Sequence, residues 1–371
     1  MKADILIIGG GVIGLSLGWK LLQGGRSVTL LERGETGRES SWAAAGMLAP
    51  VGELHFQEEN ILRLGQESMA LYPEFVRELE AFTGLGVGYR TQGSLAISLH
   101  ADDTAELRHR FQHQQEFGLP VQWMTGTEVQ RLEPALSPNV VAGVLARQDH
   151  SVDNRRFGRA LREAFLNAGG MLLENTPVEE LSLREGAPPL VRTQDQSWDS
   201  EVVVLAAGAW SGLIPGIEGA LRPLVRPVKG QILTVQGTPG LITHTLRTPD
   251  VYMVPREDGR ILIGATVEEM GFNRESTVGG VYELLRGAWR AIPGLHETAL
   301  LETGVGFRPG SRDNAPLLGA TGIPGFFLAT GHYRNGILHT PVTATYLSRL
   351  ILQQTIPEFF LEYSPARFHS S

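Results

Sequence analysis

The chain has 371 residues, enough for two domains or one large domain with a substantial core. Forty acidic against 32 basic residues give a net charge of −8, which offers no general attraction to nucleic acid or an anionic membrane. The absence of cysteine excludes disulfides, thiolate nucleophiles, cysteine-ligated metals and a cysteinyl link to a cofactor. No apolar run is long enough to cross a bilayer, so we expect a cytoplasmic protein without integral membrane association.

The first predicted unit is a strand over residues 3–8, a glycine-rich turn and a helix. Gly9 allows the tight turn, Gly11 lets the backbone approach a pyrophosphate, and Gly14 lets the helix pack closely on the strand. Glu32 ends a second apolar run, where it can accept hydrogen bonds from ribose hydroxyls and would repel a 2′-phosphate. This order of parts predicts a dinucleotide site for FAD or NAD rather than NADP.

Apolar spacing predicts the elements that follow. Helices are expected at 60–82, 101–117 and 154–168, and strands at 93–99, 121–124, 139–146, 231–236, 251–255 and 260–265. Two short apolar runs that end in glycine, within 201–210 and 325–331, are typical of central parallel strands. The expected fold class is therefore α/β (α+β overall), with a parallel central sheet in a dinucleotide-binding domain and a mostly antiparallel sheet in a second, discontinuous domain.

The order of these segments indicates that the two domains are interleaved along the chain. We predict a FAD-binding domain from residues 1–85, 148–220 and 303–371, and a substrate-binding domain from 86–147 and 221–302. Nicotinamide dehydrogenases usually keep the dinucleotide domain in one block, so this interleaving favours a flavoprotein.

The last predicted helix, at about 337–353, follows the loop 331–336. Its N-terminus would face the catalytic centre, where a helix dipole stabilises the negative charge of a reduced flavin.

Two motifs suggest other chemistry. Gly14, Ser16 and Gly18 match the GxSxG pattern of serine hydrolases, but Ser16 would lie inside the helix instead of at a strand-to-helix turn. His109 and His113 share a helix face as metal ligands could, although no third ligand is evident and a solvated face is the favoured interpretation.

Several motifs together resemble one family. They are the Gly9–Gly14 turn with Glu32, ESSWAAAGM at 39–47, PVKGQ at 227–231, Tyr252 with VPR at 254–256, GFRP at 306–309 and GHYRNGIL at 331–338. With them the chain resembles the D-amino-acid-oxidase-like family of FAD amine oxidases, and within it the members that act on glycine in thiamine biosynthesis. It departs from the usual pattern at 339–341, where many relatives have Leu-Ala-Pro, and at Val267, where a larger methionine is common.

The resemblance implies non-covalent FAD and oxidative deamination of glycine and other small amines, such as sarcosine and small D-amino acids. Hydride transfer to the flavin would leave an imine, which gives glyoxylate and ammonia, and dioxygen would become hydrogen peroxide. The implied partners are a small amino acid and dioxygen, and we also expect a homo-oligomer. A related D-amino-acid or imino-acid oxidase or dehydrogenase with a different acceptor is the alternative, and a non-catalytic flavin-binding module is a further one.

Oxidation at the α-carbon requires a held carboxylate, and the fork of Arg308 can fix one through two hydrogen bonds. Tyr252 would lend its hydroxyl to the same carboxylate. By resemblance, Met47 lies against the α-carbon, and Arg334 flanks the flavin ring and the substrate amine.

The expected FAD-binding residues extend over much of the chain. They are Gly9, Gly11, Val12, Ile13, Gly14, Glu32, Arg33, Ser40, Ser41, Ala44, Gly46, Met47, Val178, Ala207, Gly208, Trp210, His332, Arg334, Asn335, Gly336, Ile337 and Leu338.

Overall fold

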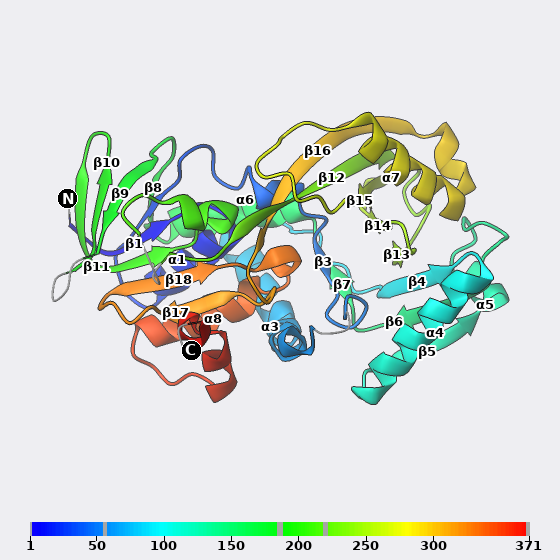
Figure 1. Ribbon diagram of the computed structural model, residues 1–371, viewed down its shortest axis with the longest axis horizontal. Helices are drawn as coiled ribbons and strands as arrows, with labels where there is room; N and C mark the ends of the chain where they lie inside the picture. Colours follow the sequence, from blue (N-terminus) through cyan, green and yellow to red (C-terminus); the bar gives the residue numbers. More distant parts are fainter. Residues whose placement is uncertain (1, 55–57, 184–187, 218–221, 369–371) are drawn as a thin grey trace.

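A computed structural model describes residues 2–54, 58–183, 188–217 and 222–368. Within these residues, two eight-stranded sheets lie toward opposite ends of an elongated molecule (Figure 1). A short two-stranded sheet and several helices complete the fold.

The first sheet is built around parallel strands. Its order is β17-β18-β11-β1-β2-β8, with the β9–β10 hairpin paired beside β11. The bounds are β1 Lys2–Ile8, β2 Val28–Leu31, β8 Met171–Leu173, β9 Val178–Ser182, β10 Leu190–Thr193, β11 Ser197–Leu205, β17 Leu317–Ala320 and β18 Phe326–Thr330. Strands β18, β11, β1, β2 and β8 run parallel, while β17 is antiparallel to β18. The two predicted central strands are therefore confirmed as β11 and β18.

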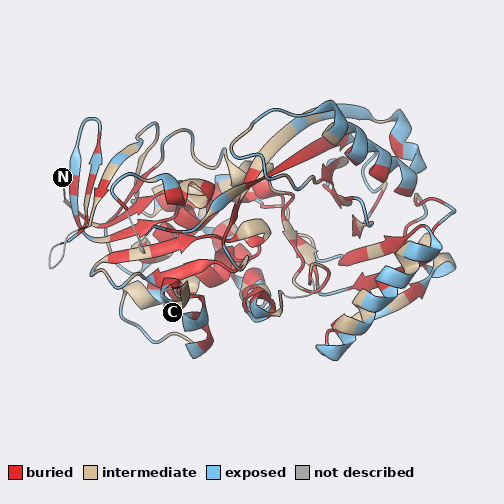
Figure 2. Cartoon of the chain, viewed as in Figure 1, coloured by how far each residue is buried: buried red, intermediate tan, exposed pale blue. Residues whose placement is uncertain are grey.

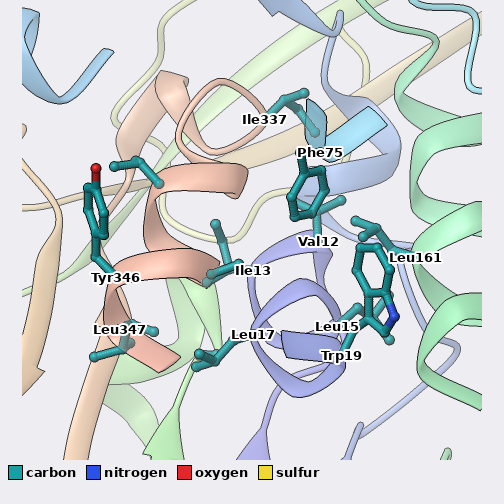
Figure 3. Close-up of a cluster of buried hydrophobic side chains, with 14 of the residues drawn as sticks. Val12, Ile13, Leu15, Leu17, Trp19, Phe75, Leu161, Ile337, Tyr346 and Leu347 are labelled. Atoms are coloured by element: carbon teal, nitrogen blue, oxygen red, sulfur yellow. The ribbon is translucent and has the colours of Figure 1, made fainter. Parts of the chain in front are cut away.

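Strand β1 is buried on both faces, as the central strand of a parallel sheet should be. Ile5 and Ile7 face a layer of helices, whereas Leu6 and Ile8 belong to a second core on the opposite face. The helix layer contains α1 Val12–Gln23, α3 Glu59–Thr83, α6 Asn154–Asn167 and α8 Thr340–Ile351. Figure 3 shows side chains of α1, including Leu15 and Trp19, packed among residues of the other helices of this layer.

The second sheet is antiparallel except where β13 runs parallel to β4. Its order is β16-β12-β15-β14-β13-β4-β6-β5. The bounds are β4 Ser94–Ser98, β5 Val121–Thr125, β6 Ala142–Ala146, β12 Arg226–Gln236, β13 Thr245–Arg247, β14 Tyr252–Pro255, β15 Arg260–Gly264 and β16 Ala299–Gly310. This arrangement confirms the predicted fold class of a parallel-containing sheet plus a mostly antiparallel one.

The two faces of the second sheet have different roles. Leu233, Met253 and Ile263 point to the face that packs on α7 Val278–Ala291. Ile232 and Val254, one residue away along their strands, point to the opposite face. Because side chains alternate along a strand, each strand contributes to a core on one side and remains available to a site on the other.

The other elements are short or exposed. They are α2 Ser40–Ala43, β3 Met47–Leu48, α4 Ala101–Glu116, α5 Gly126–Leu132, β7 His150–Ser151, and the 3-10 helices η1 Gly208–Leu213, η3 Pro293–Glu297, η4 Tyr333–Asn335, η5 Glu358–Tyr363 and η6 Pro365–Phe368. Most of α4 is exposed, as its polar sequence predicts (Figure 2).

Several elements differ from the sequence-based expectation, and helix α7 and strands β10, β13 and β17 are among those that were not predicted. The final helix begins at Thr340 rather than near residue 337, because η4 precedes it and Pro341 lies in its first turn. Strand β16, which is twelve residues long, was not predicted.

The proposed domain boundary at residue 303 lies inside β16, and the boundary at 220–221 lies outside the described residues. The domain division stays a prediction. No helix among the described residues has the length and apolar character needed to cross a bilayer.

Candidate active site

A cavity of about 650 Å³ lies between the two large sheets. One part of its wall comes from the carboxyl ends of β1, β2 and β11 and from the start of α1. The other part comes from β12, β14, β15 and β16, on the sheet face that turns away from α7. In open parallel sheets, ligands bind outside the carboxyl ends of the strands, and this cavity occupies that position.

The glycine turn after β1 opens one end of the cavity. Gly9 has φ +116°, and a Cβ there would lie 2.5 Å from the carbonyl oxygen of Ala206, so only glycine fits. Helix α1 begins at Val12 without a side-chain cap from Gly11, although the Val12 N–H donates to Ser41 Oγ at 3.2 Å. The helix N-terminus therefore presents amide groups and a positive dipole to the cavity, as a pyrophosphate requires.

Glu32 lies directly after β2 on the same wall. One carboxylate oxygen accepts the N–H of Gly10 at 2.7 Å, and the other accepts the N–H of Gly34 at 3.0 Å. These bonds fix the carboxylate, and each oxygen keeps further acceptor capacity for a ribose hydroxyl. The turn, the helix start and this acid together fit the diphosphate and ribose of a dinucleotide.

Most of the predicted FAD-binding residues line this one cavity. They are Gly9, Gly11, Val12, Ile13, Glu32, Arg33, Ser40, Ser41, Ala44, Gly46, Met47, Val178, Ala207, Gly208, Trp210, His332, Arg334, Gly336 and Ile337. Gly14, Asn335 and Leu338 do not line it. Gly14 faces the backbone of Gly9, whereas Asn335 and Leu338 line a much smaller adjacent cavity.

Arg308 projects from β16 into the cavity, on the part of the wall that the second sheet forms. Its guanidinium lies over Gly230 of β12, where a Cβ would approach Nη1 to 2.5 Å. Nη1 donates to the backbone carbonyls of Thr266 at 3.0 Å and Lys229 at 3.4 Å. Among the cavity-lining arginines of the described ranges, Arg308 alone has no carboxylate partner.

Each of the other four arginines on the cavity wall forms an ion pair. The pairs are Arg33–Glu39 at 2.6 Å, Arg38–Glu35 at 2.7 Å, Arg247–Glu53 at 2.6 Å and Arg334–Glu58. Arg308 is therefore the guanidinium whose charge is most available to an incoming anion.

Tyr252 lies beside Arg308 and interacts with it through a side-chain hydrogen bond. Its ring lies over Gly264 of β15, the residue with which it pairs in the sheet. Burial raises the pKa of Tyr252, while the charge of Arg308 opposes this increase. The phenol therefore stays protonated at neutral pH and can donate to a carboxylate held by Arg308.

Arg334 lies in η4 on the same wall, but its charge is already paired. Its guanidinium binds both carboxylate oxygens of Glu58 and also donates to the backbone carbonyl of Glu53 at 3.3 Å. Burial acts to lower the pKa of Arg334, yet the hydrogen bonds to Glu58 and the charge of Glu53 raise it above its ordinary value. Arg334 thus reaches the site as half of an ion pair.

The family comparison agrees with this geometry. The family described as DAO, FAD dependent oxidoreductase, matches residues 4–350. The chain belongs to this family. FAD is therefore its cofactor, and the residues around the Gly9 turn and Glu32 are suited to hold it. The predicted family resemblance and enzyme class are confirmed.

Members of the family with high similarity carry several names. A glycine oxidase of Geobacillus kaustophilus is 33% identical over 94% of this chain and 93% of its own length. A crystal structure of glycine oxidase from the same organism superposes with a TM-score of 0.91 at 31% identity, covering 99% of both chains.

A bifunctional protein ThiO/ThiG of Trichormus variabilis is 36% identical over 99% of this chain but only 55% of its own length. The present chain thus spans about half of that relative. A hydrogen cyanide synthase subunit HcnC of Pseudomonas aeruginosa is 31% identical, covering 98% of this chain and 96% of its own.

One ion pair on the cavity wall was not predicted from the sequence. Arg247 and Glu53 form a nearly buried ion pair on the wall, and Arg247 Nη1 lies 3.7 Å from Sδ of Met47. Met47 therefore lines the cavity as expected, and its sulfur contacts this pair. Only the three-dimensional approach of segments 194 residues apart brings the pair together, so no local sequence signal could have identified it.

The two other motifs carry no separate site. Ser16 is buried inside α1 and donates to the backbone carbonyl of Ile13 at 3.1 Å, which excludes a nucleophile elbow. No cluster of three or more metal-ligating side chains occurs in the described part of the chain. His109 is exposed as expected, but the solvated-face interpretation is wrong for His113. Its side chain is only 11% exposed and packs against Phe117.

Proposed function

We propose that the protein oxidises glycine and other small amines that carry a carboxylate. The observation that carries the proposal is Arg308, a cavity-lining guanidinium without a carboxylate partner among the described residues, beside the protonated hydroxyl of Tyr252. Arg308 lies on the part of the wall that the second sheet forms and the Gly9 turn on the part that the first sheet forms, so an amine anchored by Arg308 would lie between the two sheets.

Positioning is the main contribution of the side chains. The fork of Arg308 would fix both oxygens of the substrate carboxylate, and Tyr252 would add a third hydrogen bond. Met47 would limit the space beside the α-carbon, which favours small substrates. We propose that Arg334 contributes through the fixed Arg334–Glu58 pair, whose geometry holds the wall near the amine.

When bound, FAD supplies the two-electron acceptor for the hydride that leaves the α-carbon. The substrate imine is then hydrolysed by water to a 2-oxo acid and ammonia, and dioxygen takes up the electrons as hydrogen peroxide. For glycine the balance is glycine, dioxygen and water giving glyoxylate, ammonia and hydrogen peroxide. A general base on the protein is not required, provided that the amine binds in its neutral form.

The names of the similar family members support this assignment. Glycine oxidase is the name of a relative that matches nearly end to end, and ThiO/ThiG supports a role in thiamine biosynthesis. A hydrogen cyanide synthase subunit is similar to this chain over nearly the same length, so the names support an FAD oxidoreductase more strongly than any one product.

A related D-amino-acid or imino-acid oxidase or dehydrogenase is the second candidate. The observation that favours it is Val267, which lines the cavity and is 66% exposed, so that the wall is more open there than a methionine would leave it. A different electron acceptor would accompany the dehydrogenase form.

The test is anaerobic reduction of the purified FAD-loaded enzyme with glycine, sarcosine, D-alanine and D-proline. We expect rapid bleaching of the visible flavin absorption by glycine and sarcosine, and hydrogen peroxide with matching ammonia when air is admitted. Bleaching by D-proline alone would support the second candidate. If none of the four compounds bleaches the flavin absorption, the proposal is contradicted.

We also propose a homo-oligomer in the cytoplasm. Helix α7 carries an exposed apolar stripe of Val278, Tyr282, Leu285 and Trp289, and such stripes mark association surfaces. Light scattering after gel filtration tests the assembly, and cell fractionation tests the location. A strictly monomeric mass would contradict the first statement.

A further inference from the structure

A second arginine lies in the substrate end of the cavity, and a carboxylate covers it. Arg247 and Glu53 are 2.6 Å apart, and their side chains are only 13% and 9% exposed. Both line the cavity. A charged pair with so little contact with solvent is screened weakly, so its charges act strongly on any ligand that enters.

Arg247 and Arg308 lie on one face of the second sheet, on either side of Tyr252. Arg247 pairs with Tyr252, Tyr252 pairs with Gly264, and Gly264 pairs with Ile232 of β12. The guanidinium of Arg308 lies over Gly230, on this same β12. The charges of both arginines act on the Tyr252 hydroxyl. A ligand carboxylate held by Arg308 therefore has Arg247 as the next guanidinium along the sheet.

Glu53 offsets the charge of Arg247. Arg247 Nη1 donates to a carboxylate oxygen of Glu53, and Glu53 is the ion-pair partner that the described residues provide for Arg247. The Nε of Arg247 is also buried, and it has no hydrogen-bond partner among the described residues. Arg110 also lies near enough to Arg247 for the two positive charges to repel each other. Removing the Glu53 charge would therefore leave an uncompensated cation in the cavity.

We propose that Glu53 determines the charge selectivity of the substrate cavity by occupying Arg247. With Glu53 in place, Arg308 is the free guanidinium, so the cavity selects ligands with one carboxylate. A second ligand carboxylate would find the charge of Arg247 already offset, and the nearby carboxylate of Glu53 would repel it. The inference rests on the proposed function for the identity of the substrate, but it concerns binding and can be tested without turnover.

Three isosteric variants change the local charge in steps. Glu53→Gln leaves Arg247 uncompensated, Arg247→Gln leaves Glu53 uncompensated, and the double variant is neutral like the wild type. Ligand selectivity should follow this charge. If the single Glu53→Gln variant does not fold, comparison of Arg247→Gln with the wild type and the double variant still tests the proposal.

The probes are glycolate, with one carboxylate, and diglycolate, with two. Neither carries an amine, so neither is a substrate of the proposed reaction. Dissociation constants are measured on the FAD-loaded protein by isothermal titration calorimetry, with perturbation of the visible flavin spectrum as a second readout. The measured quantity is the ratio of the glycolate to the diglycolate dissociation constant, which cancels effects common to both ligands.

We expect this ratio to increase about tenfold or more in Glu53→Gln, since a like charge near the second carboxylate is removed in a poorly solvated site. It should fall below the wild-type value in Arg247→Gln and return close to it in the double variant. An unchanged ratio in Glu53→Gln would overturn the proposal. Equal ratios in Arg247→Gln and the double variant would overturn it as well.

Turnover gives a separate measurement. In Glu53→Gln, kcat/KM for iminodiacetate relative to glycine should increase in the same direction as the binding ratio. If the wild-type enzyme oxidises neither glycine nor any small amine, the proposed function fails. The binding ratios still decide the role of Glu53, because glycolate and diglycolate require no oxidation.

Discussion

The buried carboxyl group of Asp149 should make the free energy of unfolding depend on pH, and this dependence is a quantitative test of the structure. Its carboxylate is fully buried beside the loop that carries Glu53, where it accepts the N–H groups of Val51 and Gly52 and the hydroxyl of Ser94. Burial raises the pKa of Asp149 from 3.8 to about 7, although these hydrogen bonds oppose the increase. The folded protein therefore holds a proton on Asp149 over a pH range in which the unfolded chain has lost it.

The direction in which pH changes the free energy of unfolding follows from that difference. The contribution of Asp149 to stability is fully present below the unfolded pKa and is lost as pH rises through the folded pKa. Between these values the free energy of unfolding falls by about 1.4 kcal/mol per pH unit, which is about 3 kcal/mol from about pH 5 to neutrality. The Asp149→Asn variant has no such slope. Its stability relative to the wild type should therefore increase by that amount over the range.

The assay is urea unfolding followed by tryptophan fluorescence, at a fixed excess of FAD because ligand binding itself stabilises the fold. Asp313→Asn is the matched control. Burial tends to raise the pKa of Asp313, but hydrogen bonds from Arg367 hold it below its ordinary value, so the effect of this substitution should stay constant over the same range. A flat difference for both variants would refute the argument, since Asp149 would then already be ionised in the folded protein near pH 5.

Three predictions follow from the site. Arg308→Ala should raise KM steeply and cost about 2–5 kcal/mol in kcat/KM while the flavin spectrum is retained, and a normal rate would show that the anchor lies elsewhere. Acid or heat should release FAD into the supernatant, since the chain has no cysteine, and flavin that stays with the pellet would indicate a histidyl link. Glycine and sarcosine should have higher kcat/KM than D-phenylalanine because Met47 fills the cavity. Val267→Met should widen this preference by about 1–3 kcal/mol, and a higher value for D-phenylalanine would contradict it.

Local patterns predicted the parts of the site that depend on local geometry. The strand, glycine turn, helix and Glu32 all lie close together in the sequence, between residues 2 and 32, so their spacing determines their arrangement. Strand β18 and the C-terminal part of β11 were predictable because both faces are covered there and the sequence is continuously apolar.

Long-range pairings were not predictable in the same way. Arg334 was expected beside the flavin and substrate, but its ion pair with Glu58 depends on the approach of two segments 276 residues apart. Strand β16 was missed because its sequence has no simple apolar and polar alternation: Leu300 and Leu301 near its start are apolar but exposed. Its long pairing with β12 supplies the order instead. His113 is likewise covered in part by a long-range contact, with Glu59 of α3, in addition to the ring of Phe117 at the end of its own helix.

The division of the second sheet into two faces separates the evolution of specificity from that of stability. Positions such as Gly230, Ile232 and Tyr252 face the cavity, whereas their chain neighbours Leu233 and Met253 belong to the core under α7. A substitution at a cavity position changes the ligand environment and leaves the core under α7 in place. A mutational library restricted to the cavity-lining positions Ile232 and Tyr252 of β12 and β14 should therefore give many folded enzymes with altered substrate preference. The same number of changes at the intervening positions should give mostly unstable chains.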